Sequence, residues 1–183
     1  APSVRGELGA QLDDYLTRCA AFGFSGSVLV EKGGAIVLSK GYGLADRRTG
    51  TPNAPDTIHD IGSLTKQFTA AAILLPEQDG KLSVTDELSK HFRDAPADKR
   101  RIQLHQFLNH TSGLPRANEE IGSALQDRAV FLQRLFALPL ESKPGARFAY
   151  SNLGYDLLAV VVEQASGQTF EASISAERFS ELG

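Results

Sequence analysis

The sequence predicts an α+β fold in which one helix and a β-hairpin precede a long run of helices. Three observations predict it: helical apolar spacing near the N-terminus, two β-branched runs separated by paired glycines, and a series of apolar segments with capping residues over the rest of the chain. The chain has 183 residues, 42% of them hydrophobic and 22% charged. That is enough for one domain with a sizeable core.

The N-terminal region is expected to form a helix followed by a hairpin. Residues 7–22 are amphipathic at helical spacing, through Leu8, Leu12, Tyr15, Leu16 and Cys19. Two runs rich in β-branched residues follow, FSGSVLVE and AIVLSKGY. Gly33 and Gly34 between them can adopt positive φ, which predicts a tight turn. The next segment, ADRRTGTPNAPD, is predicted as a loop because turn-forming residues dominate it.

A helix is predicted from near Ser63 to about Asp79. Its body, KQFTAAAILL, is largely apolar, and Gly80 is a suitable C-terminal cap. Pro76 lies in its last turns, so we expect a kink or an early end there.

Further helices are predicted over most of the remaining chain. Ser83 and Asp86 resemble a capping box before the short helix DELSKHF, and LHQFLNH is another short helix. Residues 118–137 are expected to contain one longer amphipathic helix. The apolar helix LGYDLLAVVVEQAS ends at Gly167, and Thr169 can cap a last helix. Since two strands make a poor sheet, we expect further strands from sequence not present here or from another chain.

Composition excludes several classes of function. The net charge of −3 offers no basic field for nucleic acid. The longest apolar runs, AAAILL and LLAVVV, fall short of the ~20 residues that a membrane span needs. The single cysteine excludes an intrachain disulfide, and the four histidines lack metal-ligand spacing, so no metal or cofactor is expected. The start APSVRG fits a mature terminus after signal removal and a trimmed chain equally.

Ser63 and Lys66 form the first candidate site. Side chains three residues apart on a helix share a face. A serine hydroxyl is a weak nucleophile until a neighbour takes its proton or stabilises its alkoxide, and an amine can do so. The N–H groups at a helix start can hold a developing oxyanion. The alternative is structural: Ser63 as a helix cap and Lys66 as a solvated residue of the first turn.

Tyr150 and Asn152 form the second candidate site, in a loop just before an apolar helix. A tyrosine near an ammonium group can have a lowered pKa and act as a general base. An asparagine amide can donate to a substrate carbonyl and accept from a lysine. The structural alternative is a buried tyrosine followed by a helix cap.

Together these motifs resemble those of the serine β-lactamase and penicillin-binding (DD-peptidase) superfamily, in the branch of class C β-lactamases, D-alanyl-D-alanine carboxypeptidases and β-lactamase-like esterases. FSGSVLVEKGGAIVLSKGYGLAD resembles the family's opening hairpin, and IGSLTKQFTAAAILL its nucleophile helix. LHQFLNHTSGLP and PGARFAYSNLGYDLLAVVVEQASGQTFEA resemble two further landmarks. The resemblance covers essentially the whole chain and implies the α/β sandwich of the β-lactamase/transpeptidase-like fold.

The resemblance implies a role for each residue. Ser63 matches the nucleophile that forms the acyl-enzyme, and its backbone N–H matches one half of the oxyanion hole. Lys66 matches the activating lysine, and Tyr150 the general base of acylation. Asn152 matches the residue that orients the lysine and the substrate amide. His110, which suggests a Ser–His triad, is instead a structural turn residue in this family.

The family's third motif, a K-T-G or H-x-G triad on a later strand, does not follow Tyr150 here. We therefore expect residues 1–183 to be the N-terminal part of a single catalytic domain, with helix and hairpin over 1–45 and a helical region over 58–183. The missing C-terminal half is an expected partner, as a separate chain or as the rest of a longer one.

The sequence thus predicts a serine hydrolase that forms a covalent acyl-enzyme. The expected substrate is a D-Ala-D-Ala peptide, a β-lactam or a small ester, with carboxypeptidase- or esterase-like activity favoured over an efficient β-lactamase. Two alternatives remain: a non-catalytic binding or scaffold module that keeps the fold, and a Ser–Lys amidase or glutaminase. The resemblance implies a periplasmic or secreted protein, because cell-wall peptides and β-lactams are met there.

Overall fold

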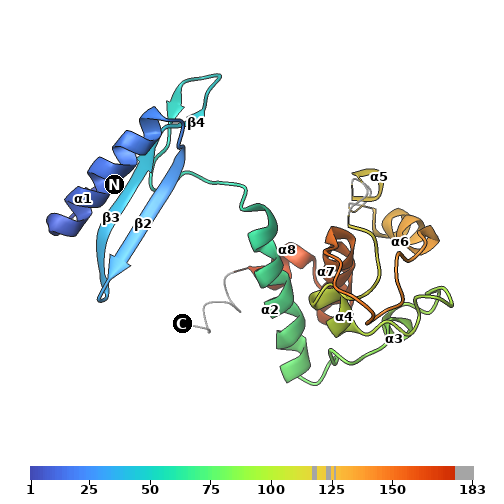
Figure 1. Ribbon diagram of the computed structural model, residues 1–183. Coiled ribbons are helices and arrows are strands. Elements are labelled where there is room, and N and C mark those ends of the chain that lie inside the picture. Colours follow the sequence, from blue (N-terminus) through green and yellow to red (C-terminus); the bar gives the residue numbers. More distant parts are fainter. Residues whose placement is uncertain (117–118, 123–124, 126, 176–183) are drawn as a thin grey trace. The chain divides into compact units, whose positions relative to one another are not determined.

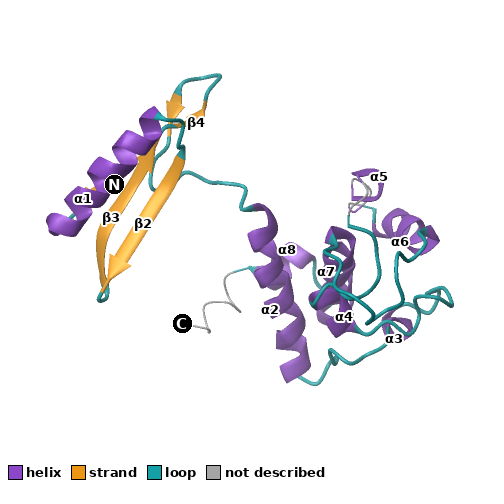
Figure 2. Cartoon of the chain, in the orientation of Figure 1, coloured by secondary structure: helices purple, strands orange, loops and turns teal. Residues whose placement is uncertain are grey.

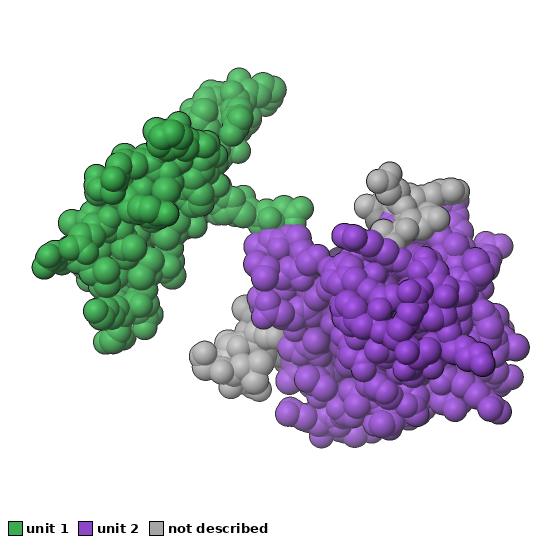
Figure 3. Space-filling view, viewed as in Figure 1, with its two compact units in different colours: residues 1–60 green, residues 61–183 purple. Residues whose placement is uncertain are grey.

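The computed structural model of the protein describes residues 1–116, 119–122, 125 and 127–175. The chain forms two compact units, residues 1–60 and residues 61–183 (Figure 3). Strands occur in the first unit, and the described part of the second is helical (Figure 2). The α+β class is confirmed.

The predicted N-terminal helix and hairpin are present in the first unit. Helix α1 spans Gly6–Ala21, and strands β2 (Gly26–Lys32) and β3 (Ala35–Tyr42) pair antiparallel. The turn between the strands uses positive φ at Gly33 and Gly34, 60° and 76°. A short strand that we did not predict, β1 (Ser3–Val4), pairs with the other edge of β3. Two residues are too few to show strand periodicity in a sequence.

Helix α1 lies directly on β3 (Figure 1). Gly9 is buried where the two elements meet, and a Cβ at this position would collide with the carbonyl oxygen of Val37. The carboxylate of Asp13 accepts hydrogen bonds from Lys40 and Tyr42 of β3, each at 2.7 Å. These bonds, the Lys40 bond foremost, lower the pKa of Asp13. Close backbone approach and a charged hydrogen bond therefore join helix and sheet.

The prediction of a plain loop after β3 is wrong. Strands β4 (Leu44–Asp46) and β5 (Thr51–Pro52) form a small antiparallel hairpin within it. The amide of Asn53 then anchors the segment, donating to the carbonyl of Tyr42 at 2.8 Å and to Ser25 Oγ at 2.9 Å. The strands are so short that the glycines and prolines around them outweigh any strand pattern.

The second unit begins with a 3₁₀ turn, η1 (Gly62–Leu64), which leads into α2 (Thr65–Gln78). Pro76 lies inside α2, and the helix continues past it to Gln78, so the expected early end does not occur. A proline inside a helix lacks the backbone N–H that would bond to the carbonyl four residues earlier, here that of Ala72. Here Lys81 N donates to Pro76 O at 2.9 Å.

The other predicted helices occur close to their expected positions. Helices α3 (Leu88–His91) and α4 (Leu104–Leu108) are short, as expected. The long apolar helix is α7 (Asn152–Ser166), closed by Gly167 at φ 70°, and α8 (Phe170–Ile174) is capped by the Thr169 side chain.

The amphipathic helix expected within residues 118–137 is present as α6 (Arg128–Ala137), which is shorter than predicted and leaves out Leu125. A separate short helix, α5 (Glu119–Gly122), precedes it, while residues 118, 123–124 and 126 lie outside the described part. Asp127 begins α6, because its carboxylate accepts from the backbone N–H groups of Ala129 and Val130, both at 3.1 Å. Such a cap starts a new helix even when apolar periodicity runs through it.

Helix α7 is the centre of the second unit. It contacts α2, α4, α6 and α8, and its middle turns are buried (Figure 1). The fully buried side chains around it come from several elements: Ile73, Phe107, Phe131, Leu135, Leu157, Leu158 and Val161. An ion pair adds to this core where Glu163 accepts two bonds of 2.8 Å from Arg128 and one of 3.0 Å from Phe170 N. The ends of α6, α7 and α8 meet at this carboxylate.

In the part of the chain that the structure describes, none of the helices combines the length and apolarity needed to span a bilayer.

Replacing a core leucine of α7 should be costly. Leu158 is fully buried, so Leu158→Ala is expected to lower the free energy of unfolding by about 2–5 kcal/mol. Leu74 of α2 is the matched control, because 47% of its surface is exposed and Leu74→Ala should cost about 1 kcal/mol or less. Urea unfolding measures both, and equal losses would contradict this account of the core.

The Glu163 carboxylate should make stability depend on pH. Its bonds with Arg128 lower the pKa of Glu163. Its contribution is therefore full above the ordinary glutamate pKa and is lost as the pH falls through the lowered value. Glu163→Gln should cost about 1–2 kcal/mol near neutral pH, and urea unfolding should show that difference shrinking as the pH falls below the ordinary glutamate pKa. A difference that stays constant with pH would assign the effect to packing.

Candidate active site

The first turns of the second unit present Ser63 and Lys66. Gly62 adopts φ 53°, a left-handed conformation in which a side chain would strain the backbone, and a Cβ there would meet no other atom. The chain then turns through η1, which carries the exposed Ser63, into α2, whose first turn carries the half-buried Lys66. Ser63 thus sits on a 3₁₀ turn immediately before the α-helix that we expected to contain it.

All four residues singled out in the sequence lie together. Ser63 Oγ is 2.7 Å from the Tyr150 hydroxyl, across 87 positions of sequence. Lys66 Nζ donates to Asn152 Oδ1 at 2.8 Å and, at a longer 3.4 Å, to Ser63 Oγ. The hydroxyl, the phenol and the amine form one continuous hydrogen-bonded chain that ends on the amide, so a proton on Ser63 has a direct acceptor.

Ser151, between the two loop residues, fixes both of them. It is buried, and its Oγ accepts from Gly154 N at 3.2 Å, capping α7, while donating to Pro115 O at 2.7 Å. Asn152 N donates to Arg116 O at 2.7 Å. We did not single out Ser151, although a serine before an apolar helix is a recognisable N-cap signal. These bonds place Tyr150 and Asn152 against the start of α2.

His110 holds the loop from its other side and does not contact Ser63. Its φ of 59° is the one positive value among the described non-glycine residues. Its Nδ1 accepts from Ser151 N at 3.2 Å, and its ring lies 4.5 Å from the ring of Tyr150. Burial, followed by the charge of Lys66, lowers the pKa of His110. The imidazole therefore remains a neutral acceptor near pH 7, in agreement with the structural role expected for it.

The surroundings of Tyr150 lower the pKa of its hydroxyl. Its pKa is lowered first by interaction with Lys66 and next by the hydrogen bond with Ser63, against a small opposing effect of burial. Lys66 Nζ is 4.9 Å from its ring centre, and the Arg116 guanidinium carbon is 5.8 Å away. The neighbouring Tyr155 behaves oppositely, since burial raises its pKa and its hydroxyl donates to Leu108 O at 2.9 Å. Lys66 also lies 5.4 Å from the Tyr155 ring centre, but of these two tyrosines only Tyr150 has a lowered pKa.

A half-buried acid, Asp156, lies one turn beyond Asn152 on α7. Burial raises the pKa of Asp156, and the charge of Lys66 partly opposes that shift. Burial thus disfavours the charged form of this carboxyl, which interacts with Lys66 at the edge of the site. Nothing in the sequence distinguished Asp156 from a solvated helix residue.

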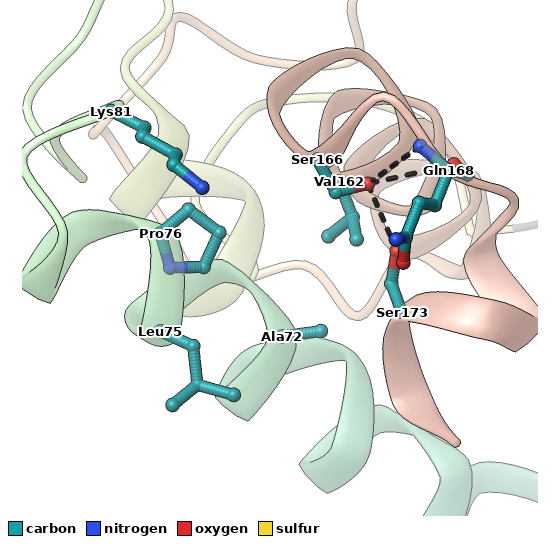
Figure 4. A pocket seen from close by; sticks show the side chains of 8 residues that line it. All are labelled: Ala72, Leu75, Pro76, Lys81, Val162, Ser166, Gln168 and Ser173. Atoms are coloured by element: carbon teal, nitrogen blue, oxygen red, sulfur yellow. Dashed lines mark hydrogen bonds between the residues drawn. The ribbon is translucent and has the colours of Figure 1, made fainter. Parts of the chain in front are cut away.

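A separate cavity of about 130 Å³ lies between α2, α7 and α8 (Figure 4). Its lining is Ala72, Leu75, Pro76, Lys81, Val162, Ser166, Gln168 and Ser173, so it includes none of the four site residues. Ser166 Oγ is already engaged there with Gln168 and Ser173 (Figure 4). Across the described ranges, no group of three or more metal-ligating side chains comes together.

The sequence is similar to those of known proteins. The family model described as Beta-lactamase matches residues 14–183. Protein flp of Staphylococcus aureus is 33% identical over 156 residues, covering 81% of this chain and 31% of that protein. The putative penicillin-binding protein PbpX of Bacillus subtilis is 32% identical over 173 residues, covering 94% and 42% respectively. The chain therefore spans less than half the length of these curated relatives.

A solved structure shares the fold. The penicillin-binding protein from Bacillus halodurans superimposes with a TM-score of 0.77 at 32% identity, over 91% of this chain and 54% of that one. The antiparallel sheet and the helical arrangement described above are thus those of the β-lactamase/transpeptidase-like fold, represented here by the N-terminal part of its length.

The pKa of Tyr150 should rise when Lys66 loses its charge. Lys66→Gln removes the cation that most lowers this pKa, so the phenol should titrate at higher pH. Labelling tyrosine at Cζ with ¹³C and following the Tyr150 resonance with pH measures the change, and Tyr150→Phe assigns the signal. Lys81→Gln is the matched control, because Lys81 lies at the separate cavity. An unmoved midpoint in Lys66→Gln would rule out this coupling.

Proposed function

The chain belongs to the beta-lactamase family, and from that premise we propose that it is the N-terminal part of a serine hydrolase working through a covalent acyl-enzyme. One observation carries the proposal: Ser63 Oγ lies 2.7 Å from the hydroxyl of Tyr150, whose pKa is lowered. A nucleophile in hydrogen-bond contact with a base, held by further groups, is the geometry that nucleophilic catalysis requires.

In the proposed acylation step, the Tyr150 phenolate takes the proton of Ser63 as Oγ attacks the substrate carbonyl carbon. The carbonyl π electrons move to oxygen, and backbone N–H groups, including that of Ser63, stabilise the oxyanion. The tetrahedral intermediate collapses and expels the leaving group, which takes the proton from Tyr150. Lys66 stays bonded to Asn152 and stabilises the phenolate whenever it forms.

In the proposed deacylation step, Tyr150 takes a proton from water, which attacks the acyl carbon of the Ser63 ester. Collapse of the second intermediate breaks the ester bond, and Ser63 Oγ recovers its proton from Tyr150. No metal or organic cofactor takes part in this scheme. Asn152 has its amide nitrogen left for a substrate carbonyl while its oxygen accepts from Lys66.

The proposed substrates are a D-Ala-D-Ala peptide, a β-lactam or a small ester. Two proteins that are 32% identical to this chain over the aligned regions carry penicillin-binding names, which supports reactivity with a β-lactam ring. Carboxypeptidase- or esterase-like turnover is favoured over efficient β-lactam hydrolysis.

The proposal extends to the setting of the protein. We propose that both units belong to one catalytic domain, completed by a C-terminal half with the third motif, and that it works in the periplasm or outside the cell. Cell fractionation of the source organism with an antibody to residues 1–60 tests the compartment and, by apparent mass, the length of the native chain.

A β-lactam should label Ser63. Incubation of the chain with a fluorescent penicillin, followed by intact mass spectrometry, is expected to show one adduct that Ser63→Ala abolishes. Tyr150→Phe should slow labelling by about 10²–10⁴-fold, since it removes the general base. Ser89→Ala on α3 is the matched control and should label normally.

Absence of an adduct would contradict the hydrolase if the Tyr150 titration shows the site to be assembled. The non-catalytic module would then be the better explanation. Labelling by a penicillin together with ammonia release from a panel of primary amides would favour the amidase.

A further inference from the structure

Arg116 belongs to the loop between α4 and α5, and its side chain is exposed beside the proposed general base. Its guanidinium carbon lies 5.8 Å from the centre of the Tyr150 ring, within the range of a cation–π interaction. Its backbone carbonyl accepts from Asn152 N at 2.7 Å. The main chain of this one residue therefore holds Asn152, while its side chain covers Tyr150.

The guanidinium of Arg116 faces the aromatic ring of Tyr150. Among the described residues, no carboxylate forms an ion pair with it, whereas Arg128 pairs with Glu163 and Arg147 with Glu141. A paired guanidinium would present little net charge to its neighbours, but an unpaired one acts fully on whatever lies within a few ångströms. Tyr150 is one ionisable group that feels this charge.

Every element packed against Tyr150 contributes a group to its environment. Lys66 of α2 and Ser63 of η1 reach the phenol directly, and the His110 ring stacks at 4.5 Å. The Tyr155 ring of α7 lies 5.1 Å from the His110 ring, and Asp156 of α7 interacts with Lys66. Arg116 is thus the second cation beside the Tyr150 ring, after Lys66.

We propose that Arg116 is a positioning residue for Tyr150: it holds the phenol against Ser63 and, with Lys66, favours the phenolate that receives the serine proton. This role gains its catalytic meaning from the proposed function. The hydrogen bonds of Lys66 also explain why a second cation, Arg116, is needed near Tyr150. Lys66 is bonded to Asn152 and shared with Ser63, so it cannot act on Tyr150 alone. Arg116 is free of such duties and never loses its proton.

Because the Arg116 side chain is exposed, its effect on Tyr150 should depend on salt concentration. Interactions of an exposed charge are screened by salt much more than those of a half-buried one. The influence of Arg116 on Tyr150 should therefore weaken between about 0.05 M and about 1 M NaCl, while that of Lys66 should persist. A side chain that merely filled space would show no such dependence.

Titration of ¹³Cζ-labelled Tyr150 in the full chain tests the proposal without requiring turnover. In Arg116→Gln the midpoint should move to higher pH and lose most of its salt dependence, and Arg116→Lys should restore both in part. Arg147→Gln is the matched control, because Arg147 is an exposed arginine three residues before Tyr150 that lies near Glu141 instead. It should leave the midpoint in place.

Acylation by penicillin supplies the second measurement. Its rate below the Tyr150 midpoint should fall about threefold or more in Arg116→Gln, with the acidic limb of the pH profile displaced to higher pH. A midpoint unchanged in Arg116→Gln overturns the proposal, as does an equal displacement in Arg147→Gln. A rate loss confined to anionic substrates with an unmoved midpoint also overturns it, since Arg116 would then bind substrate. If the midpoint moves but no variant acylates, the positioning role stands and the proposed function fails.

Discussion

The bond from the Lys66 ammonium to the Asn152 amide oxygen joins the starts of α2 and α7, and the site depends on it. Two helices that begin 87 positions apart present their first turns to one another. The buried contact between them fixes the separation of their axes, and the bond fixes the relative position of their ends. Ser63 and Tyr150 approach within 2.7 Å because each lies two residues before the first residue of its helix.

The loop before α7 has to hold Tyr150 and Asn152 against the start of α2, and several hydrogen bonds fix it there. Ser151 caps the helix, His110 accepts from the loop backbone, and Arg116 accepts from the first helical residue. Each bond satisfies a backbone group that a helix start leaves without an intrahelical partner. The cost of holding His110 at φ 59° is offset by its bond with Ser151 and its stacking on Tyr150.

Two positively charged side chains lie beside Tyr150 in the site. Lys66 and Arg116 lie near the phenol, and burial raises the pKa of Asp156, which interacts with Lys66. An arrangement of this kind favours any step that places negative charge on Tyr150 or on a substrate oxygen close to Ser63. The stability of the second unit comes from elsewhere, from the apolar core around α7 and from the Glu163 ion pair.

Local patterns in the sequence were reliable where they were long or carried a distinct cap. The hairpin at Gly33 and Gly34, the nucleophile helix and α7 all followed from periodicity and turn residues. Strands of two or three residues were missed, because alternation cannot show itself over such lengths. The helix expected within residues 118–137 is shorter than predicted, because the cap at Asp127 starts it later than the apolar spacing suggested.

By itself, the sequence determined the α+β class, the family resemblance and the identity of Ser63, Lys66, Tyr150 and Asn152 as candidates, since these depend on short motifs and on local helix chemistry. Only the tertiary structure decided that the two motifs meet, that His110 stands behind Tyr150 and that Arg116 and Asp156 border the site. The physical reason is that such contacts join residues tens of positions apart. Their distances depend on how α2 and α7 pack, and no local pattern in the chain encodes that packing.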